Sequence, residues 1–263
     1  MRILAGRRTI VRGLTLAHEV HVLHLRPACY LAERVLLPGD PHRALAVAQD
    51  LLDSPKMFNH SRGLWGYTGT APDGEPLTIQ STGMGGPSAA IVCEELIALG
   101  ARRLVRIGTC GALVDGIELG ELLVAKAVVP ADGASVALGA DALVSPDREL
   151  TERLVAAGAR PVTVVTSDLF YDRRDGAAGG WIERGAVAVE MEAAAILQVA
   201  ARHGAAAACV LGVTDVPGER GSRRATPEQI ERIGLRVGAA GYAALAEPGR
   251  ARTVPRGLPA TTP

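Results

Sequence analysis

The amino-acid sequence predicts a single α/β domain built around a central β-sheet. Short apolar runs of strand length alternate with stretches of helical apolar spacing along the chain. Glycine-rich turns join several of these runs to the helical stretches, and neither a repeat nor a linker interrupts residues 20–246. The 263 residues are enough to bury a full hydrophobic core.

Eight strands are expected where short runs of apolar and β-branched residues end in turn residues. Several of them lead directly into a helical stretch, as strand–turn–helix units do. The expected strands cover residues 34–38, 64–70, 76–82, 103–109, 121–129, 161–167, 186–190 and 206–213.

Four helices are expected between these strands. Asp40 is suited to cap the first helix, because its side chain can accept from free N–H groups, and Pro41 follows at the first helical position. Gly100 and Gly204 stand where glycines commonly end helices. The expected helices cover residues 41–53, 87–100, 190–204 and 227–246.

The ends of the chain differ in composition from its middle. We expect residues 1–19 to form a disordered extension, residues 20–247 the domain, and the Pro/Arg/Thr-rich residues 248–263 a disordered tail. No apolar run reaches the roughly 18 residues of a membrane span, and the start lacks the apolar core of a secretory signal.

Charge and cysteine content narrow the classes of function. The 28 basic and 28 acidic residues balance to a net charge of +0, so a field that attracts nucleic acid is not expected. The four cysteines are scattered, without CxxC spacing, which indicates reduced thiols in a cytoplasmic protein and no zinc site.

Charged residues in apolar surroundings mark candidate functional sites. Glu190 and Glu192 stand at a strand-to-helix junction, where one carboxylate suits the helix N-terminus and the second needs another explanation, such as sugar hydroxyls. Arg106 interrupts the apolar strand at 103–109, on the face opposite Val105 and Ile107. A buried arginine requires a partner, and an oxyanion ligand is favoured here.

Three turns at strand ends offer further candidates. In PGDPHR (38–43) a strand passes through Gly39 into a helix whose N-terminus can bind an anion, with Arg43 one turn inside; an ordinary strand–turn–helix with a solvated arginine fits the motif equally well. The glycine-rich STGMGGPS (81–88) allows a ligand close to the backbone, although alone it indicates a tight turn. Asp215 ends a strand and can serve as a general acid, or as an ordinary turn aspartate.

Together these motifs resemble the nucleoside phosphorylase family, which includes purine nucleoside, methylthioadenosine and uridine phosphorylases. The resemblance spans residues 20–246, and in family order it rests on PGDPHR, RGLWGYTGT, STGMGGPSAAIVCEELIALGARRLVRIGTCGAL, TSDLFY, VEMEAA and VTD. It implies one α/β domain whose mixed central sheet forms a distorted barrel flanked by helices. It also implies a homo-oligomer built from dimers, usually a hexamer, with active sites shared between subunits.

The resemblance implies roles for phosphate and ribose ligands. Arg62 is implied to reach the phosphate of the neighbouring subunit, and Glu192 and Met191 to hold the ribose, with Glu192 accepting from its 2′- and 3′-hydroxyls. A histidine near the start is implied to reach the neighbour's ribose 5′ end; His21 and His24 both fit, and His24 is preferred for its distance from PGDP. Phosphate binding within the same subunit is implied for Gly39, Arg43, Arg106 and Thr109.

The resemblance also implies a base site and favours a purine. Asp215 matches the aspartate that protonates N7 of a leaving purine, although Thr214 replaces the usual serine before it. The segment between Phe170 and Glu190 is short and lacks the Gln-x-Arg clamp of uridine phosphorylases, whereas CEELIALG and DGAS resemble those enzymes. Four arginines could assist the aspartate: Arg220, Arg223, Arg224 and Arg232. The implied base-binding residues are Cys110, Gly111, Phe170, Glu190 and Asp215.

The implied activity is phosphorolysis of purine nucleosides in nucleoside salvage, by a pentosyltransferase that uses inorganic phosphate as co-substrate and no metal or other cofactor. The expected partners are nucleoside and phosphate, without nucleic acid or membrane. Uridine phosphorylase and 5′-methylthioadenosine phosphorylase remain alternatives within the family. A nucleosidase is disfavoured because it has no need of three phosphate-binding arginines, and a non-catalytic nucleoside-binding protein is a further alternative.

Overall fold

The structure is a computed structural model that describes residues 10–11, 14–15, 22–174, 176–218 and 221–247. The predicted disordered tail lies outside these residues, as does most of the predicted extension. Two short strands of that extension are described, β1 (Ile10–Val11) and β2 (Leu14–Thr15), which pair antiparallel with each other. Strand β2 also pairs with β3 (Leu31–Ala32), which lies beyond the extension. In the described part, no helix has the length and apolar character needed to cross a membrane.

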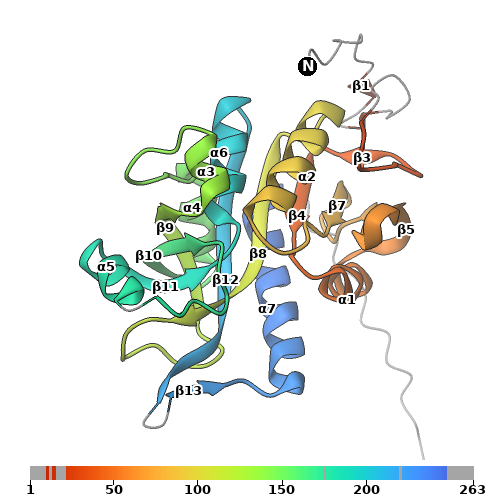
Figure 1. The fold of residues 1–263 in the computed structure, drawn as a ribbon. Helices are drawn as coiled ribbons and strands as arrows, with labels where there is room; N and C mark the ends of the chain where they lie inside the picture. Colours follow the sequence, from red (N-terminus) through yellow and green to blue (C-terminus); the bar gives the residue numbers. More distant parts are fainter. Residues whose placement is uncertain (1–9, 12–13, 16–21, 175, 219–220, 248–263) are drawn as a thin grey trace, which may run out of the picture.

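Ten described strands form one mixed sheet (Figure 1). Its order is β13-β12-β9-β10-β11-β8-β4-β7-β6-β5, and an additional pairing of β12 with β8 closes the first part into a ring. Their bounds are β4 (Arg34–Leu37), β5 (Asp53–Asn59), β6 (Gly66–Thr70), β7 (Pro76–Gln80), β8 (Arg103–Ala112), β9 (Leu122–Ala131), β10 (Arg160–Ser167), β11 (Ala186–Glu190), β12 (Ala206–Gly218) and β13 (Gly221–Arg224).

The ring of β8, β12, β9, β10 and β11 is a small closed barrel, and β4, β7, β6 and β5 extend the sheet from β8. Figure 1 shows β9–β12 on one side of β8 and β4, β5 and β7 on the other. Neighbours β4, β8 and β12 run parallel, whereas β11 and β8 are antiparallel, as are β12 and β9. The predicted α/β domain with a mixed, barrel-like sheet is therefore confirmed.

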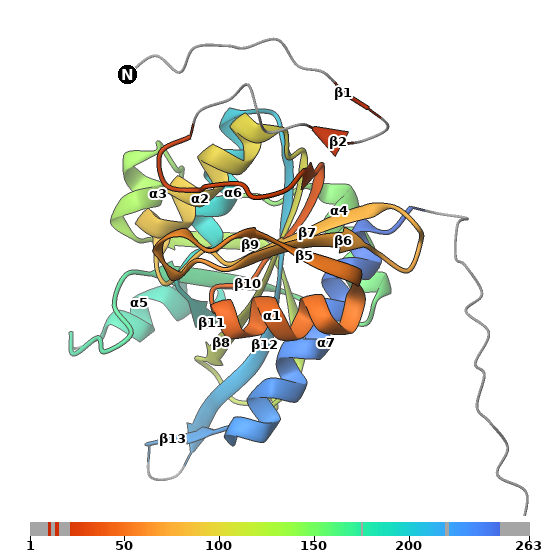
Figure 2. The same ribbon diagram turned by 90° about the vertical axis from the view of Figure 1, so that its right-hand side faces the viewer.

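Helices cover the sheet from two directions. Helices α2, α3 and α6 contact one another on one side, and α7 contacts α1 and α4 on the other; α2, α3 and α6 lie above the sheet and α1 and α7 below it in Figure 2. The bounds are α1 (Pro41–Leu51), α2 (Gly86–Leu99), α3 (Gly133–Ala137), α4 (Arg148–Ala156), α5 (Ala177–Glu183), α6 (Ala193–Arg202) and α7 (Pro227–Leu245).

The helices expected over 41–53 and 190–204 are shorter in the structure, ending at Leu51 and beginning at Ala193, but the predicted capping residues agree with it. Asp40 caps α1 by accepting from the N–H groups of His42 and Arg43, and Pro41 is the first helical residue. Gly100, with φ of +122°, ends α2, and Gly204, with φ of +63°, follows α6. These helix ends determine where the loops between the helices and the neighbouring strands begin.

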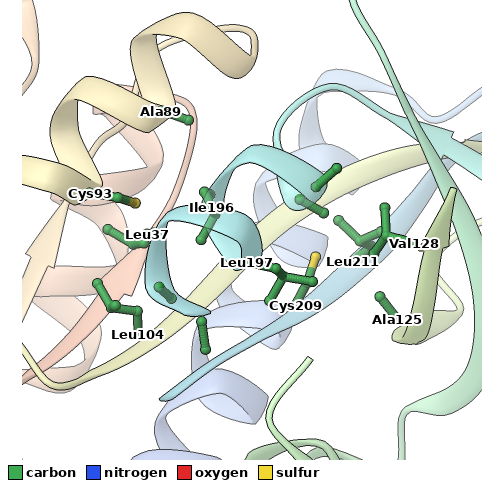
Figure 3. Packing of buried hydrophobic residues seen from close by; sticks show 14 of the residues in the cluster. Leu37, Ala89, Cys93, Leu104, Ala125, Val128, Ile196, Leu197, Cys209 and Leu211 are labelled. Carbon is green, nitrogen blue, oxygen red and sulfur yellow. The ribbon is translucent and has the colours of Figure 1, made fainter. Parts of the chain in front are cut away.

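Two apolar clusters lie on opposite faces of β8. Leu104 belongs to the cluster under α2 and α6, and Val105 and Ile107 belong to the cluster under α1 and α7. Figure 3 shows the first cluster, in which Cys93 of α2 and Ile196 of α6 approach the strand residues. Alternation therefore sends Arg106 toward the α2–α6 side, opposite Val105 and Ile107 as predicted.

Candidate active site

The candidate site lies where three parallel strands end. Gly39 follows β4, Thr109 lies near the end of β8, and Asp215 lies near the end of β12. Because β4 and β12 flank β8 in parallel register, their carboxyl ends meet at one edge of the sheet. Ligands of open α/β sheets bind at such edges.

Arg106 forms the centre of the site. Its side chain is almost fully buried; Nε donates to Glu190 Oε2 at 2.8 Å, and Nη2 lies 2.5 Å from Glu192 Oε2. Burial alone would lower the pKa of Arg106, but the carboxylates of Glu192 and Glu190 outweigh it and raise the pKa. The guanidinium is therefore permanently charged and held along two of its edges.

Glu190 ends β11 with a carboxylate that accepts from several donors. Besides Nε of Arg106, these are the hydroxyl of Thr166 and the backbone N–H groups of Glu192 and Ala193 at 2.9 Å. The carboxylate thus satisfies free donors at the start of α6 while fixing the arginine. Its predicted contact with the base stays a prediction, since the contacts observed here join it to protein groups.

Glu192 lies at the N-cap position of α6, and its two carboxylate oxygens bind different partners. Its Oε1 accepts from the N–H of Gly85 at 2.6 Å, and its Oε2 pairs with Arg106. Burial raises the pKa of Glu192, although Arg106 acts in the opposite direction. A desolvated carboxylate in this position is a strong acceptor for sugar hydroxyls.

The third edge of Arg106 differs from the other two. Among the described residues its Nη1 has no hydrogen-bond acceptor although it is buried. A Cβ at Gly39 would lie 3.9 Å from this nitrogen and 3.2 Å from the carbonyl oxygen of Gly83. The N–H of Gly83 in turn donates to the carbonyl oxygen of Gly39 at 3.0 Å. Nη1 therefore points to the place where the two glycine turns meet.

Arg43 supplies a second cation near this place. It extends from the first turn of α1, and its Nη1 lies 3.5 Å from the carbonyl oxygen of Ile107 on β8. Burial and the charge of Arg106 lower the pKa of Arg43. Two guanidinium groups that repel each other at the end of a helix dipole favour an anion between them.

Gly108 allows the arginine to lie flat against its own strand. A Cβ at this position would lie 2.7 Å from Nη2 and 2.8 Å from Cζ of Arg106, and 2.9 Å from Cδ2 of Leu211. A side chain here would displace the guanidinium, so this glycine is required by close approach.

Asp215 sits in a second polar group on β12. Its Oδ1 lies 2.6 Å from Nε of Arg224, and its Oδ2 accepts from the hydroxyl of Thr214 at 2.8 Å. The β12–β13 hairpin places Asp215 opposite Arg224, whose guanidinium lies 5.6 Å from the ring centre of Phe170. Of the four arginines considered from the sequence, Arg224 pairs with the aspartate; Arg220 lies outside the described residues.

Four further predicted base and sugar ligands adjoin these two groups: Cys110, Gly111, Phe170 and Met191. Gly111 faces Asp215, since a Cβ there would lie 3.7 Å from Cβ of the aspartate. Cys110 is buried beneath it, and burial raises the pKa of its thiol. Met191 is half-buried between the two glutamates, and Phe170 is 58% exposed. Within the described part of the chain, no cluster of three His, Cys, Asp or Glu side chains could hold a metal ion.

Among the described residues, His24 and Arg62 do not join this hydrogen-bond network. In the described chain, no hydrogen bond or ion pair joins either of them to Arg106, Glu192 or Asp215. Nδ1 of His24 lies 2.7 Å from Glu95, whereas Arg62 is exposed in a 3₁₀ turn. His21 falls outside the described residues.

The structure also reveals partners that sequence reasoning did not single out. Thr166 and Gly85 bind the two glutamates, and Glu95 holds the segment of His24. All three belong to motifs already noted (TSDLFY, STGMGGPS and CEELIALG), but their roles depend on contacts across 24 to 107 positions of sequence.

Comparison with known proteins agrees with this geometry. A family model described as "Phosphorylase superfamily" matches residues 33–246. A "Purine nucleoside phosphorylase DeoD-type" of Oceanobacillus iheyensis is 36% identical over 195 residues, 70% of this chain and 83% of the relative. One of the same name from Caldanaerobacter subterraneus subsp. tengcongensis is 36% identical over 222 residues, 79% of this chain and 95% of the relative. The resemblance to nucleoside phosphorylases, its purine branch and the pentosyltransferase class are thereby confirmed.

Proposed function

Because the chain belongs to the phosphorylase superfamily, we propose that it catalyses the reversible phosphorolysis of purine nucleosides. The observation that carries this proposal is Nη1 of Arg106, a buried donor without an acceptor among the described residues, which points between Gly39 and Gly83. A buried charged donor left unpaired costs free energy, so the site favours an oxyanion there. Arg43 adds a second charge, as a phosphate dianion requires.

The same arginine places phosphate next to the sugar. Nη2 of Arg106 pairs with Glu192, which is proposed to accept from the 2′- and 3′-hydroxyls of ribose. Phosphate held by the other edge then lies below the anomeric carbon, and this proximity lowers the entropic part of the barrier. Its negative charge stabilises the oxocarbenium-like state formed as the glycosidic bond breaks.

Asp215 is proposed to supply the proton. The C1′–N9 bond breaks, the base leaves with the proton of Asp215 on N7, and a phosphate oxygen bonds to C1′ to form α-ribose 1-phosphate. The sugar phosphate formed from HPO4²⁻ still carries one P–OH proton on a non-bridging oxygen, and release of that proton restores the acid, so atoms and charges balance. Arg224 and Thr214 orient the carboxyl group, and Phe170 is proposed to pack against the base.

Other members of the class would use the same site differently. A nucleosidase would place water where Arg43 and Arg106 offer charges to an anion, which makes phosphorolysis the better fit. Uridine and 5′-methylthioadenosine remain the alternative substrates, and a non-catalytic binding protein would have no need of the Asp215–Arg224 pair.

The wider setting of the enzyme is also proposed from the family. We propose a cytoplasmic enzyme of nucleoside salvage that assembles as a homo-oligomer of dimers, a hexamer, and uses phosphate as co-substrate without another cofactor. The four cysteines are free thiols, in keeping with a reducing compartment. Arg62 and His24, which have no hydrogen bond or ion pair to Arg106, Glu192 or Asp215 in the described part of their own chain, are proposed to complete the site of the neighbour.

Substitution of Asp215 tests the assignment of the proton donor. We expect Asp215→Ala to lower kcat for inosine by about 100-fold or more while the Kd for phosphate changes little. Arg224→Gln should share part of this loss, and Arg223→Gln, a change at an exposed neighbour on the same hairpin, should not. Equal losses of turnover and phosphate binding in Asp215→Ala would contradict the role.

A further inference from the structure

Arg62 adopts a backbone conformation that costs free energy. Its φ of +60° lies in the left-handed region, which residues other than glycine rarely occupy. The side chain is exposed and has no hydrogen bond or ion pair within the described part of the chain. Such a conformation persists only where neighbouring groups enforce it, and it is often found at functional positions.

The groups that enforce it come chiefly from one buried side chain, Asn59. Its Nδ2 donates to the carbonyl oxygens of Leu64 at 2.5 Å and Ser61 at 3.4 Å, and its Oδ1 accepts from the N–H of Ser61 at 3.3 Å. Nε2 of Gln80 donates to the same Leu64 oxygen at 3.0 Å. Both ends of the turn around Arg62 are thus bound to fully buried amides.

Asn59 also binds a second segment of the chain. Its Oδ1 accepts from the N–H of Arg26 at 2.9 Å, just after His24. Glu95 accepts from the N–H groups of Leu23, His24 and Leu25 and from Nδ1 of His24, so the whole segment 23–26 is fixed. One amide therefore joins the segment of His24 to the turn of Arg62.

We propose that Asn59 is a positioning residue that presents Arg62 and His24 as one rigid unit to the active site of a neighbouring copy of the chain. This inference rests on the proposed function. It assigns to Asn59 an effect on the reaction of the other subunit, whereas its own subunit's Arg106 and Asp215 receive none of its hydrogen bonds.

Two single variants provide the first test of this inference. Asn59→Asp turns the donor that faces the Leu64 oxygen into an acceptor, so the turn loses its strongest bond. We expect kcat/KM for phosphate to fall about 10- to 100-fold, as a small misplacement of a ligand does. Arg62→Gln, which changes an exposed side chain, is the matched variant and should produce the same loss without lowering Tm.

Co-expression with Asp215→Asn then separates action on the neighbour from damage to the fold. In a mixed pair, the Asn59→Asp subunit keeps its own Asp215 and receives Arg62 and His24 from a partner with intact Asn59. Differently tagged chains, purified through both tags, should recover phosphorolysis of inosine well above either parent. The Arg62→Gln and Asp215→Asn pair should recover activity in the same way.

Three results would overturn the inference while wild-type phosphorolysis stands. They are wild-type kcat/KM in Asn59→Asp, full activity in Arg62→Gln, and mixed oligomers of Asn59→Asp no more active than their parents. Asn59→Ser, whose shorter side chain cannot span from Arg26 to Leu64, repeats the assay if the aspartate variant does not assemble. If the wild-type chain releases no base in the presence of phosphate, the proposed function itself fails.

Discussion

Arg106 and Glu192 form an ion pair at 2.5 Å in which both side chains are almost completely buried. The residue proposed to hold phosphate is therefore bonded directly to the residue proposed to hold ribose. The third member of the group, Glu190, accepts from Nε of the same guanidinium and from the backbone N–H of Glu192. The two side chains proposed to bind phosphate and ribose are consequently fixed relative to each other before any substrate binds.

Removal of Arg106 should destabilise the fold as well as the site. Arg106→Gln leaves two buried carboxylates without their cation, and we expect a loss of about 3–5 kcal/mol in the free energy of unfolding. Adding Glu192→Gln should restore part of that loss, because one of the unpaired charges is then gone. Urea denaturation of the two single variants and the double variant measures this coupling.

The exposed pair Arg148–Glu152 provides the control for that cycle. Arg148→Gln removes a solvated i,i+4 partner, and it should leave the urea midpoint unchanged. Additive effects of Arg106→Gln and Glu192→Gln would show that the buried ion pair does not couple the two side chains.

The raised pKa of Glu192 predicts a pH-dependent contribution to stability. Burial raises the pKa of this carboxyl above its ordinary value of 4.5, so the folded protein binds the proton more tightly than the unfolded chain. Ionised Glu192 is therefore a cost at neutral pH, and this cost disappears as pH falls through the raised pKa toward 4.5. Relative to Glu192→Gln, the wild-type protein should gain stability as pH decreases.

Denaturation of both proteins at a series of pH values between 7 and 4.5 measures that difference. Taking the difference between wild type and Glu192→Gln cancels the groups that titrate equally in both. A difference that stays constant, or that favours the variant at lower pH, would show that Glu192 does not ionise with a raised pKa.

Gly108 should be sensitive to the smallest possible side chain. Gly108→Ala places a methyl group within 3 Å of the guanidinium of Arg106 and of Leu211, so the arginine must move. We expect kcat/KM for phosphate to fall about 100-fold, in line with a displacement of about 1 Å. Gly179→Ala, at an open position inside α5, should leave the kinetics unchanged and raise the free energy of unfolding by about 0.5–1 kcal/mol through helix propensity.

A wild-type phosphate response in Gly108→Ala would mean that the guanidinium does not need its observed position. A lowered Tm would reveal loss of folding in this variant. Calorimetric titration with phosphate measures the ligand site separately.

Glu95 should matter only for nucleosides that carry a 5′-hydroxyl. It binds Nδ1 of His24 and thereby leaves Nε2 for the ribose 5′ end of a neighbour's substrate, as proposed. We expect Glu95→Gln to lower kcat/KM for inosine about tenfold, the scale of one hydrogen bond to a charged group. With 5′-deoxyinosine, wild type and variant should be equal.

The adjacent Glu94→Gln, which alters a partly exposed pair with His203, is the matched control and should affect neither substrate. Equal losses for inosine and 5′-deoxyinosine in Glu95→Gln would assign Glu95 a structural role only.

Most of the central sheet was predictable because its strands are buried and rich in β-branched residues. The eight predicted segments correspond to β4 and to β6–β12. Strand β5 escaped prediction because it is a polar edge strand that contains Pro55 and exposes most of its residues. Helices α4 and α5 escaped as well, since α4 buries only Leu150 and Leu154 and α5 buries no residue.

The candidate site was predictable as a set of residues but not as a network. Arg106 was recognisable because a charge inside an apolar strand demands a partner. The four donors of Glu190 were not, since two of them are backbone N–H groups created by the start of α6. Arg224 could be chosen among four arginines only from the register of the β12–β13 hairpin, which places it opposite Asp215.

We propose that this chain transfers the sugar of a purine nucleoside to phosphate. The most direct test incubates the wild-type protein with inosine, adenosine, methylthioadenosine or uridine, with and without phosphate, and identifies the sugar product. Such a transfer requires that a purine nucleoside releases its base only with phosphate present and yields α-ribose 1-phosphate or its methylthio analogue. Base release that is independent of phosphate and yields a free sugar would contradict it, as would release from uridine alone.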